Sequence, residues 1–205
     1  MNVRILLVPL VLALLAWGCG EPATPKKPAA TEKIAPAPAA APAPATPPAA
    51  ATAAAAQPAK ATLVNNQGQK VGEATLAETD QGVKINLDVQ DLPPGVHAFH
   101  IHQKADCNAP DFMSAGGHFN PFGKHHGLEN PEGPHAGDLP NITVGNDGKG
   151  KVSVTAKLVT LKEGEKNSLF QTGGTSLVIH ANPDDNVSDP AGNAGPRIAC
   201  GPITK

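Results

Sequence analysis

The sequence predicts an all-β domain over residues 62–205, folded as an antiparallel sandwich or barrel. Apolar and polar residues alternate in several short runs, which is the pattern of strands with one buried face. Turn-forming residues separate these runs, and no amphipathic segment is long enough for a substantial helix. A segment of this length is sufficient for a single domain with its own core.

Three runs carry the alternation. Their inward-facing residues are predicted to be Val83, Ile85, Leu87 and Val89; then Val96, Ala98 and, across Phe99, Ile101; then Val152, Val154 and Ala156. The turns are predicted at Asn66-Gln67-Gly68, Leu92-Pro93-Pro94-Gly95 and Asn146-Asp147-Gly148.

Residues 1–18 have the pattern of a secretory signal peptide. Arg4 precedes an apolar run over residues 5–16, and small residues follow near Cys19. A membrane-spanning helix is the alternative, but it needs about 20 apolar residues. This run has 12 residues and contains Pro9, so the signal peptide is the better interpretation.

Cys19 lies at the inferred cleavage point, and the residues Leu-Leu-Ala-Trp-Gly-Cys that end there resemble the lipobox of bacterial lipoproteins. Ala16 and Trp17 depart from that motif, so ordinary cleavage before Cys19 is the alternative. The chain has three cysteines, and lipidation of Cys19 would account for the odd one. We therefore expect Cys19 to be lipidated, with the lipid as the only membrane attachment.

Residues 19–61 are predicted to be a disordered tether. Ala and Pro make up 29 of the 41 residues from Glu21 to Ala61, a composition that cannot bury enough apolar surface to fold. In polyproline II conformation, at about 3.1 Å per residue, it would reach on the order of 100 Å. A passive spacer is favoured over a proline motif with a specific partner. The net charge of −2, without a polybasic run, disfavours a nucleic-acid partner.

All eight histidines lie between positions 97 and 180. His100 and His102 are separated by one residue in a predicted strand, so both imidazoles leave the same face and can share one metal ion. His180 ends another apolar strand and adds an imidazole to this set. Four nitrogen donors suit Cu(II).

The Gly/Pro-rich segment 118–138 is a long loop that carries further metal-binding side chains: His118, His125, His126, His135 and Asp138. Three imidazoles and one carboxylate satisfy the tetrahedral preference of Zn²⁺, and a zinc ion held by four protein ligands would be structural. The alternative is a flexible histidine-rich loop that binds metal only adventitiously.

Five segments in order resemble the copper–zinc superoxide dismutases: 97-HAFHIH-102, 118-HFNP-121, 135-HAGD-138, 177-LVIH-180 and 192-GNAGPRIACG-201. The resemblance covers the predicted domain. It implies an eight-stranded Greek-key β-sandwich or flattened barrel with long metal-binding loops. The implied activity is conversion of superoxide to O₂ and H₂O₂ by copper redox cycling, with one copper and one zinc ion per subunit.

The resemblance also implies a role for each matching residue. Copper would be held by His100, His102, His118 and His180, and zinc by His118, His126, His135 and Asp138, with His118 shared. Asp184 would orient His100 and His126, Cys107 and Cys200 would form a disulfide, and Arg197 would dock the superoxide anion beside copper. His118 and Arg197 are the implied catalytic residues. His97 and His125 match no ligand position and are expected to be structural or exposed.

Two alternatives use the same scaffold: an exported copper/zinc buffer and a metal-delivery domain. Arg197 favours the enzyme, because storage of metal needs no anion-docking arginine. A signal peptide and lipid anchor predict an exported protein of the bacterial cell envelope or periplasm. The loop over residues 181–196 is short compared with eukaryotic members, and both a monomer and a homodimer are compatible with the sequence.

Overall fold

The computed structural model describes residues 58–205, which form nine β-strands and one 3₁₀ turn. The strands are β1 Ala59–Asn65, β2 Lys70–Thr79, β3 Gly82–Val89, β4 Gly95–His97, β5 Phe99–His102, β6 Ile142–Val144, β7 Gly150–Ala156, β8 Ser176–His180 and β9 Arg197–Thr204. The 3₁₀ turn is Met113–Ala115, the only helical element between residues 58 and 205, and no helix in this range is long and apolar enough to cross a membrane.

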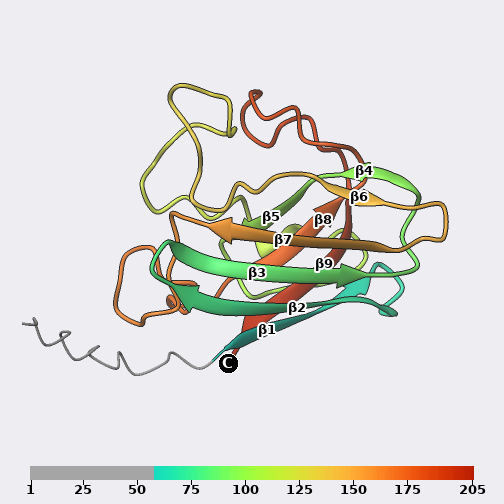
Figure 1. Ribbon diagram of the computed structural model, residues 1–205, viewed down its shortest axis with the longest axis horizontal. Helices are drawn as coiled ribbons and strands as arrows, with labels where there is room; N and C mark the ends of the chain where they lie inside the picture. The colour runs from blue at the N-terminus through green and yellow to red at the C-terminus, as the bar shows by residue number, and fades with distance from the viewer. Residues whose placement is uncertain (1–57) are drawn as a thin grey trace, which may run out of the picture. The chain divides into compact units, whose positions relative to one another are not determined.

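Seven strands form one curled antiparallel sheet in the order β5-β8-β9-β1-β2-β3-β7, and β4 pairs with β6 in a second, two-stranded sheet (Figure 1). Strands β4 and β5 are separated only by Ala98, so one extended run of the chain contributes to both sheets. The nine strands are therefore eight extended runs. The predicted all-β fold class is confirmed.

The strand β3 follows the predicted alternation: Val83, Ile85, Leu87 and Val89 are all buried, with exposed residues between them. The run through β4 and β5 does not. Val96, which we expected to face inward, is 44% exposed, whereas His97 is buried. The physical reason is the change of sheet at Ala98, where the N–H of Ala98 donates to the carbonyl of Asn182 and its carbonyl accepts from His180.

The first strand begins at Ala59, three residues before the predicted start of the domain at residue 62. Ala59 pairs with Leu76 of β2, and Lys60 pairs with both Thr75 and Thr204. The alanines of this strand face the core, although their composition resembles that of the preceding segment. The predicted signal peptide, Cys19 and most of the predicted tether lie outside the described residues.

Two loops extend from the sheets at the top of Figure 1 and position the functional residues. The metal loop is residues 118–138, and the C-terminal loop is residues 181–196. They lie side by side: the N–H of Glu129 donates to the carbonyl of Asn186, and the side chain of Asn130 donates to the carbonyls of His126 and Val187.

Candidate metal centre

The strand β5 carries His100 and His102, and it is the edge strand against which the metal loop packs. Its partner on the other side is β8, which ends at His180. On the free side, β5 forms short antiparallel bridges in which His102 faces His118 and His100 faces Asp138. The backbone thus brings strand and loop residues together.

Gly137 allows this close approach of loop and strand. Its N–H donates to the carbonyl of Phe119, and its carbonyl accepts from the N–H of Ile101, each over 2.9 Å. A Cβ atom at position 137 would lie 2.3 Å from the carbonyl oxygen of Ile101. Any residue larger than glycine would therefore push the metal loop away from β5.

The first cluster consists of four buried imidazoles from His100, His102, His118 and His180. Each offers one ring nitrogen to a common centre, and these nitrogens lie within 4.8 Å of one another. The Nε2 atoms of His102 and His180 are 3.4 Å apart. Within the described chain, Nδ1 of His100 and Nε2 of His118 are buried without any hydrogen-bond partner. Two orphaned nitrogens facing other imidazoles fit a metal ion, because an unpaired buried polar atom is otherwise costly.

In three of these four histidines, the opposite ring nitrogen contacts a protein acceptor, which fixes the ring. His100 Nε2 lies 2.7 Å from Asp184, His102 Nδ1 lies 2.9 Å from the carbonyl of Gly116, and His180 Nδ1 lies 3.2 Å from the carbonyl of Gly195. An N–H held by such an acceptor leaves the other nitrogen as a lone-pair donor. This arrangement orients the rings for metal binding.

The second cluster consists of His118, His126, His135 and Asp138. The Nδ1 atoms of the three histidines lie 2.9, 3.1 and 3.3 Å from Oδ1 of Asp138. Four ligands at about 2.0–2.1 Å from a tetrahedral zinc ion would be roughly 3.3 Å apart. The donor types and their spacing therefore fit zinc.

The other carboxylate oxygen of Asp138 is held by the backbone of the metal loop itself. Oδ2 accepts hydrogen bonds from the N–H groups of Gly127 and His135, each over 2.9 Å. His118 belongs to both clusters, with Nε2 facing the first and Nδ1 facing the second. One imidazole thus connects the two centres.

Asp184 makes a second connection between the clusters. Its Oδ2 lies 2.7 Å from Nε2 of His100, and its Oδ1 lies 3.0 Å from Nε2 of His126. The side chain of Asn141 holds the backbone of Asp184 by accepting from its N–H over 2.8 Å and donating to its carbonyl over 2.9 Å. Asn141 was not predicted as a site residue, because nothing in its local sequence indicates a partner 43 residues away.

Burial keeps the first cluster in the neutral form that binds metal. It lowers the pKa of His118 to about 4 and that of His180 to about 3, and it also lowers the pKa of His100 and His102. The second cluster is different. Burial opposes protonation of His126, but hydrogen bonds with Asp138 and Asp184 raise its pKa to about 9.

Arg197 begins β9 and is partly buried, and its guanidinium donates to two backbone carbonyls: Nη1 to Phe112 over 2.7 Å and Nη2 to Gly116 over 2.6 Å. Burial lowers the pKa of Arg197, but an arginine stays charged at physiological pH. Both carbonyls belong to the disulfide loop, residues 103–117. The disulfide between Cys107 and Cys200 ties this loop to β9.

The comparison with known proteins identifies this arrangement. A family model described as copper/zinc superoxide dismutase (SODC) matches residues 70–203. The chain belongs to the copper/zinc superoxide dismutase family. The resemblance inferred from the five sequence segments is thereby confirmed, and the family implies that copper and zinc are the metals of the two clusters.

Relatives of this superoxide dismutase family member cover its described domain. A copper–zinc superoxide dismutase (number 2) of Aquifex aeolicus (strain VF5) is 60% identical over 146 residues, which are 71% of this chain and 85% of the relative. The crystal structure of a SOD-like protein from Bacillus subtilis aligns with a TM-score of 0.68 at 44% identity, covering 70% of this chain and 96% of that one. The structure of the Cu/Zn superoxide dismutase from Brucella abortus aligns with a TM-score of 0.58 at 30% identity, covering 72% of this chain and 99% of that one.

Two histidines of this superoxide dismutase family member lie outside both clusters. His97 is buried, with Nδ1 2.9 Å from the carbonyl of His180 and Nε2 2.8 Å from the carbonyl of Pro93. The exposed side chain of His125 lies 2.5 Å from Asp189. From the sequence we expect these two residues to be structural or exposed, and the structure places His97 in the interior and His125 on the surface.

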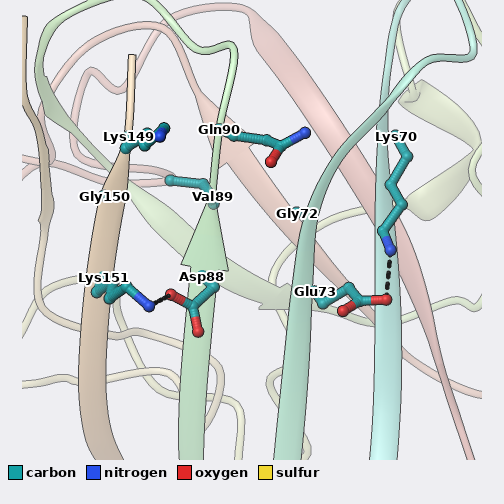
Figure 2. Close-up of a pocket in the computed structure, with 9 residues that line it drawn as sticks. All are labelled: Lys70, Gly72, Glu73, Asp88, Val89, Gln90, Lys149, Gly150 and Lys151. Carbon is teal, nitrogen blue, oxygen red and sulfur yellow. Dashed lines mark hydrogen bonds and ion pairs between the residues drawn. The ribbon is translucent and has the colours of Figure 1, made fainter. Parts of the chain in front are cut away.

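A hollow elsewhere on the domain is lined by charged residues where β2 and β7 begin and β3 ends. Figure 2 shows its two ion pairs, Lys70 with Glu73 and Lys151 with Asp88. None of the eight histidines lines this hollow. These four charged side chains are exposed, so their ion pairs contribute little to stability. The fifth charged residue of the lining, Lys149, is a single exposed cation, and the hollow plays no part in metal binding.

Proposed function

We propose that the protein is a copper–zinc superoxide dismutase, which converts two superoxide anions and two protons to O₂ and H₂O₂. The observation that carries the proposal is the pair of buried clusters that share His118, with two unpartnered ring nitrogens at the first cluster. The relatives named superoxide dismutase support it, at 60% identity in the case of the Aquifex aeolicus protein.

In this proposal the domain binds one copper and one zinc ion. The copper ligands are His100, His102, His118 and His180, and the zinc ligands are His118, His126, His135 and Asp138. The all-imidazole set suits a copper ion that changes oxidation state, since a thiolate ligand would favour electron-transfer chemistry. The zinc set has no thiolate and leaves no open position, so zinc is structural.

Bound copper would supply the one-electron redox change that the conversion of superoxide to O₂ and H₂O₂ requires. Arg197 docks the anion through its permanent positive charge, while its bonds to Phe112 and Gly116 hold the guanidinium in place. His118 holds a proton at Nε2 when that nitrogen is free, and it donates this proton to the reduced substrate. Asp184 keeps His100 in the required tautomer and orientation.

The outer segments belong to the same proposal. Residues 1–18 would be removed on export, and Cys19 would carry the lipid. The tether predicted over residues 19–61 would act as a spacer up to residue 58, since β1 begins at Ala59. The disulfide supports an oxidising compartment such as the bacterial periplasm or cell envelope. There the enzyme would protect the envelope from superoxide.

The direct test is superoxide consumption by the protein after loading with copper and zinc, compared with the metal-free protein. We expect rapid consumption only in the loaded sample. A loaded protein that binds both metals but leaves superoxide to decay at its spontaneous rate would instead support the buffer or metal-delivery function.

A further inference from the structure

Asp189 of the C-terminal loop contacts two consecutive residues of the metal loop, His125 and the proposed zinc ligand His126. Its Oδ1 accepts a hydrogen bond from the backbone N–H of His126 over 2.7 Å, and its Oδ2 lies 2.5 Å from Nδ1 of His125. We infer that Asp189 is a positioning residue for zinc, which acts by anchoring the backbone of His126. This inference rests on the proposed zinc ligand set.

His126 needs such an anchor because it lies in a Gly/Pro-rich loop without regular secondary structure. Its ring is fully buried and lies between two carboxylates, with Nδ1 3.1 Å from Asp138 and Nε2 3.0 Å from Asp184. No strand neighbour holds its main chain. Instead, Asp189 accepts from its N–H, and the side chain of Asn130 donates to its carbonyl over 2.9 Å.

The following residue shows how closely the two loops approach each other at this point. Gly127 has a φ of +113°, and a Cβ atom there would lie 2.1 Å from the carbonyl oxygen of Asn186. A small displacement of the C-terminal loop would therefore shift the backbone on which the imidazole of His126 is mounted. Zinc affinity depends on how the ligands are held, because mutation of a residue that holds a metal ligand commonly lowers metal affinity by about 10- to 100-fold.

The carboxylate of Asp189 makes two contacts of unequal value. The hydrogen bond from the His126 main chain is charge-assisted and is directed at the ligand residue itself. The contact with His125 is between side chains that are 55% and 46% exposed, and pairs of this kind contribute little. The acceptor oxygen, and not the ion pair with His125, is therefore the part that positions zinc.

Asp185 provides a matched control in the same loop. Its carboxylate accepts from the backbone N–H groups of Val187 and Ser188 and from the side chain of Asn193, all within the C-terminal loop. Loss of Asp185 should therefore loosen the turn of that loop without removing a contact to the metal loop. The two aspartates separate a general effect on the loop from an effect on His126.

The experiment uses the protein loaded with one equivalent of zinc. Zinc release to an excess of a chromogenic chelator is timed for the parent, Asp189→Ala, Asp189→Asn, His125→Ala and Asp185→Ala. The visible spectrum of Co²⁺ bound in place of zinc reports the ligand geometry. We expect Asp189→Ala to release zinc about tenfold faster or more and to alter the cobalt spectrum. The release rates of the other three variants should stay within about threefold of that of the parent. The amide oxygen of Asp189→Asn can still accept from the N–H of His126, and His125→Ala and Asp185→Ala keep the hydrogen bond from His126 to Asp189.

The inference is wrong if Asp189→Ala releases zinc no faster than Asp185→Ala, or if Asp189→Asn loses zinc as fast as Asp189→Ala. It is also wrong if the denaturation midpoint of metal-free Asp189→Ala falls far enough to account for the faster release by general unfolding. His126→Ala is measured in parallel. A His126→Ala protein that holds zinc as tightly as the parent would contradict the proposed ligand set itself, a failure distinct from that of Asp189.

Discussion

Arg197 and His102 donate to the same carbonyl oxygen, that of Gly116, over 2.6 Å from Nη2 and 2.9 Å from Nδ1. The proposed anion-docking group and a proposed copper ligand are thereby held at a fixed relative position. The shared acceptor belongs to the disulfide loop, which Cys107 links to Cys200 in β9. The geometry of substrate docking thus depends on the loop as well as on the arginine.

Replacement of Arg197 by alanine should lower kcat/KM by about tenfold or more, which corresponds to about 1.4 kcal/mol of lost stabilisation. Metal content should be unchanged, because the guanidinium of Arg197 donates to the backbone carbonyls of Phe112 and Gly116 and to no ligand side chain, and alanine keeps the main chain that pairs with His180 in the sheet. The rate of the parent should fall as ionic strength rises, because salt screens the attraction between Arg197 and superoxide. The rate of the variant should fall less steeply, because the variant lacks this charge. Steady-state kinetics over a range of salt concentrations measure both effects.

Lys84→Ala is the control for the loss of one positive charge, because Lys84 is an exposed residue of β3. It should keep the rate and salt dependence of the parent. If Arg197→Ala also kept both, with full metal content, the arginine would only anchor the disulfide loop.

Removal of the disulfide by Cys107→Ala with Cys200→Ala should lower both stability and activity. The disulfide joins residues 93 apart in sequence. The chain-entropy model gives about 4–5 kcal/mol for a loop of that length, as an upper figure. Activity should fall because the loop that carries Phe112 and Gly116 is no longer tied to β9. Thermal melting and kcat/KM of the double variant test this, and unchanged values for both would refute it.

The metal-free protein should be most stable near pH 6.5. His118 and His180, with pKa values of about 4 and 3 in the folded state, bind fewer protons than the unfolded chain below pH 6.5, so stability falls as the pH drops. His126, with a pKa of about 9, binds a proton in the folded state that the unfolded chain lacks above pH 6.5. Its contribution is therefore lost as the pH rises toward 9.

Denaturation midpoints of the metal-free protein from pH 4.5 to 9.5 measure this profile. The metal-loaded protein is the reference, and its profile should be flatter above pH 6.5 because zinc replaces the proton of His126. A metal-free midpoint that rises steadily from pH 6.5 to 9 would show that His126 is not stabilised by its two carboxylates.

Replacement of Asp184 by asparagine should weaken both metal sites, since one carboxylate holds His100 and His126. The amide can accept from one of the two imidazoles but presents an N–H to the other. We expect about a tenfold loss of affinity for each metal, measured by competition with chelators. Asp185→Asn is the neighbouring control and should leave both affinities unchanged. An effect of Asp184→Asn on one metal only would show that the carboxylate does not couple the clusters.

The Cys19→Ala variant should be exported as a soluble protein with the activity of the parent. Lipidation requires the cysteine thiol, and the proposed metal ligands all lie beyond residue 99. Fractionation of cells into membrane and soluble periplasmic material shows the location. Full membrane retention of the variant would refute the lipid anchor and favour an uncleaved apolar segment.

The sequence predicted the strand face of His100 and His102 because side chains alternate with a period of two along a strand, and this rule is local. It could not predict the change of sheet at Ala98, which reversed the expected orientation of Val96 and His97. That change depends on contacts with Asn182 and His180, about 80 residues away along the chain.

The same limit applies around the metal centre. The residue types and the family resemblance indicated the two donor sets, and the structure brings their side chains together. The contacts of Asn141 with Asp184 and of Asp189 with His126 join loops that are 43 and 63 residues apart. Asparagine and aspartate are common in any loop, so their types alone do not reveal such partners.

The central claim is that His118 belongs to both metal sites, and its most direct test is elemental analysis of protein loaded with both metals. The account predicts one copper and one zinc per chain in the parent and in His125→Ala, whose residue lies outside both clusters. It predicts that His118→Ala impairs binding of both metals and abolishes superoxide consumption in the same samples. Two zinc ions with negligible copper in the parent, or loss of only one metal from His118→Ala, would contradict it.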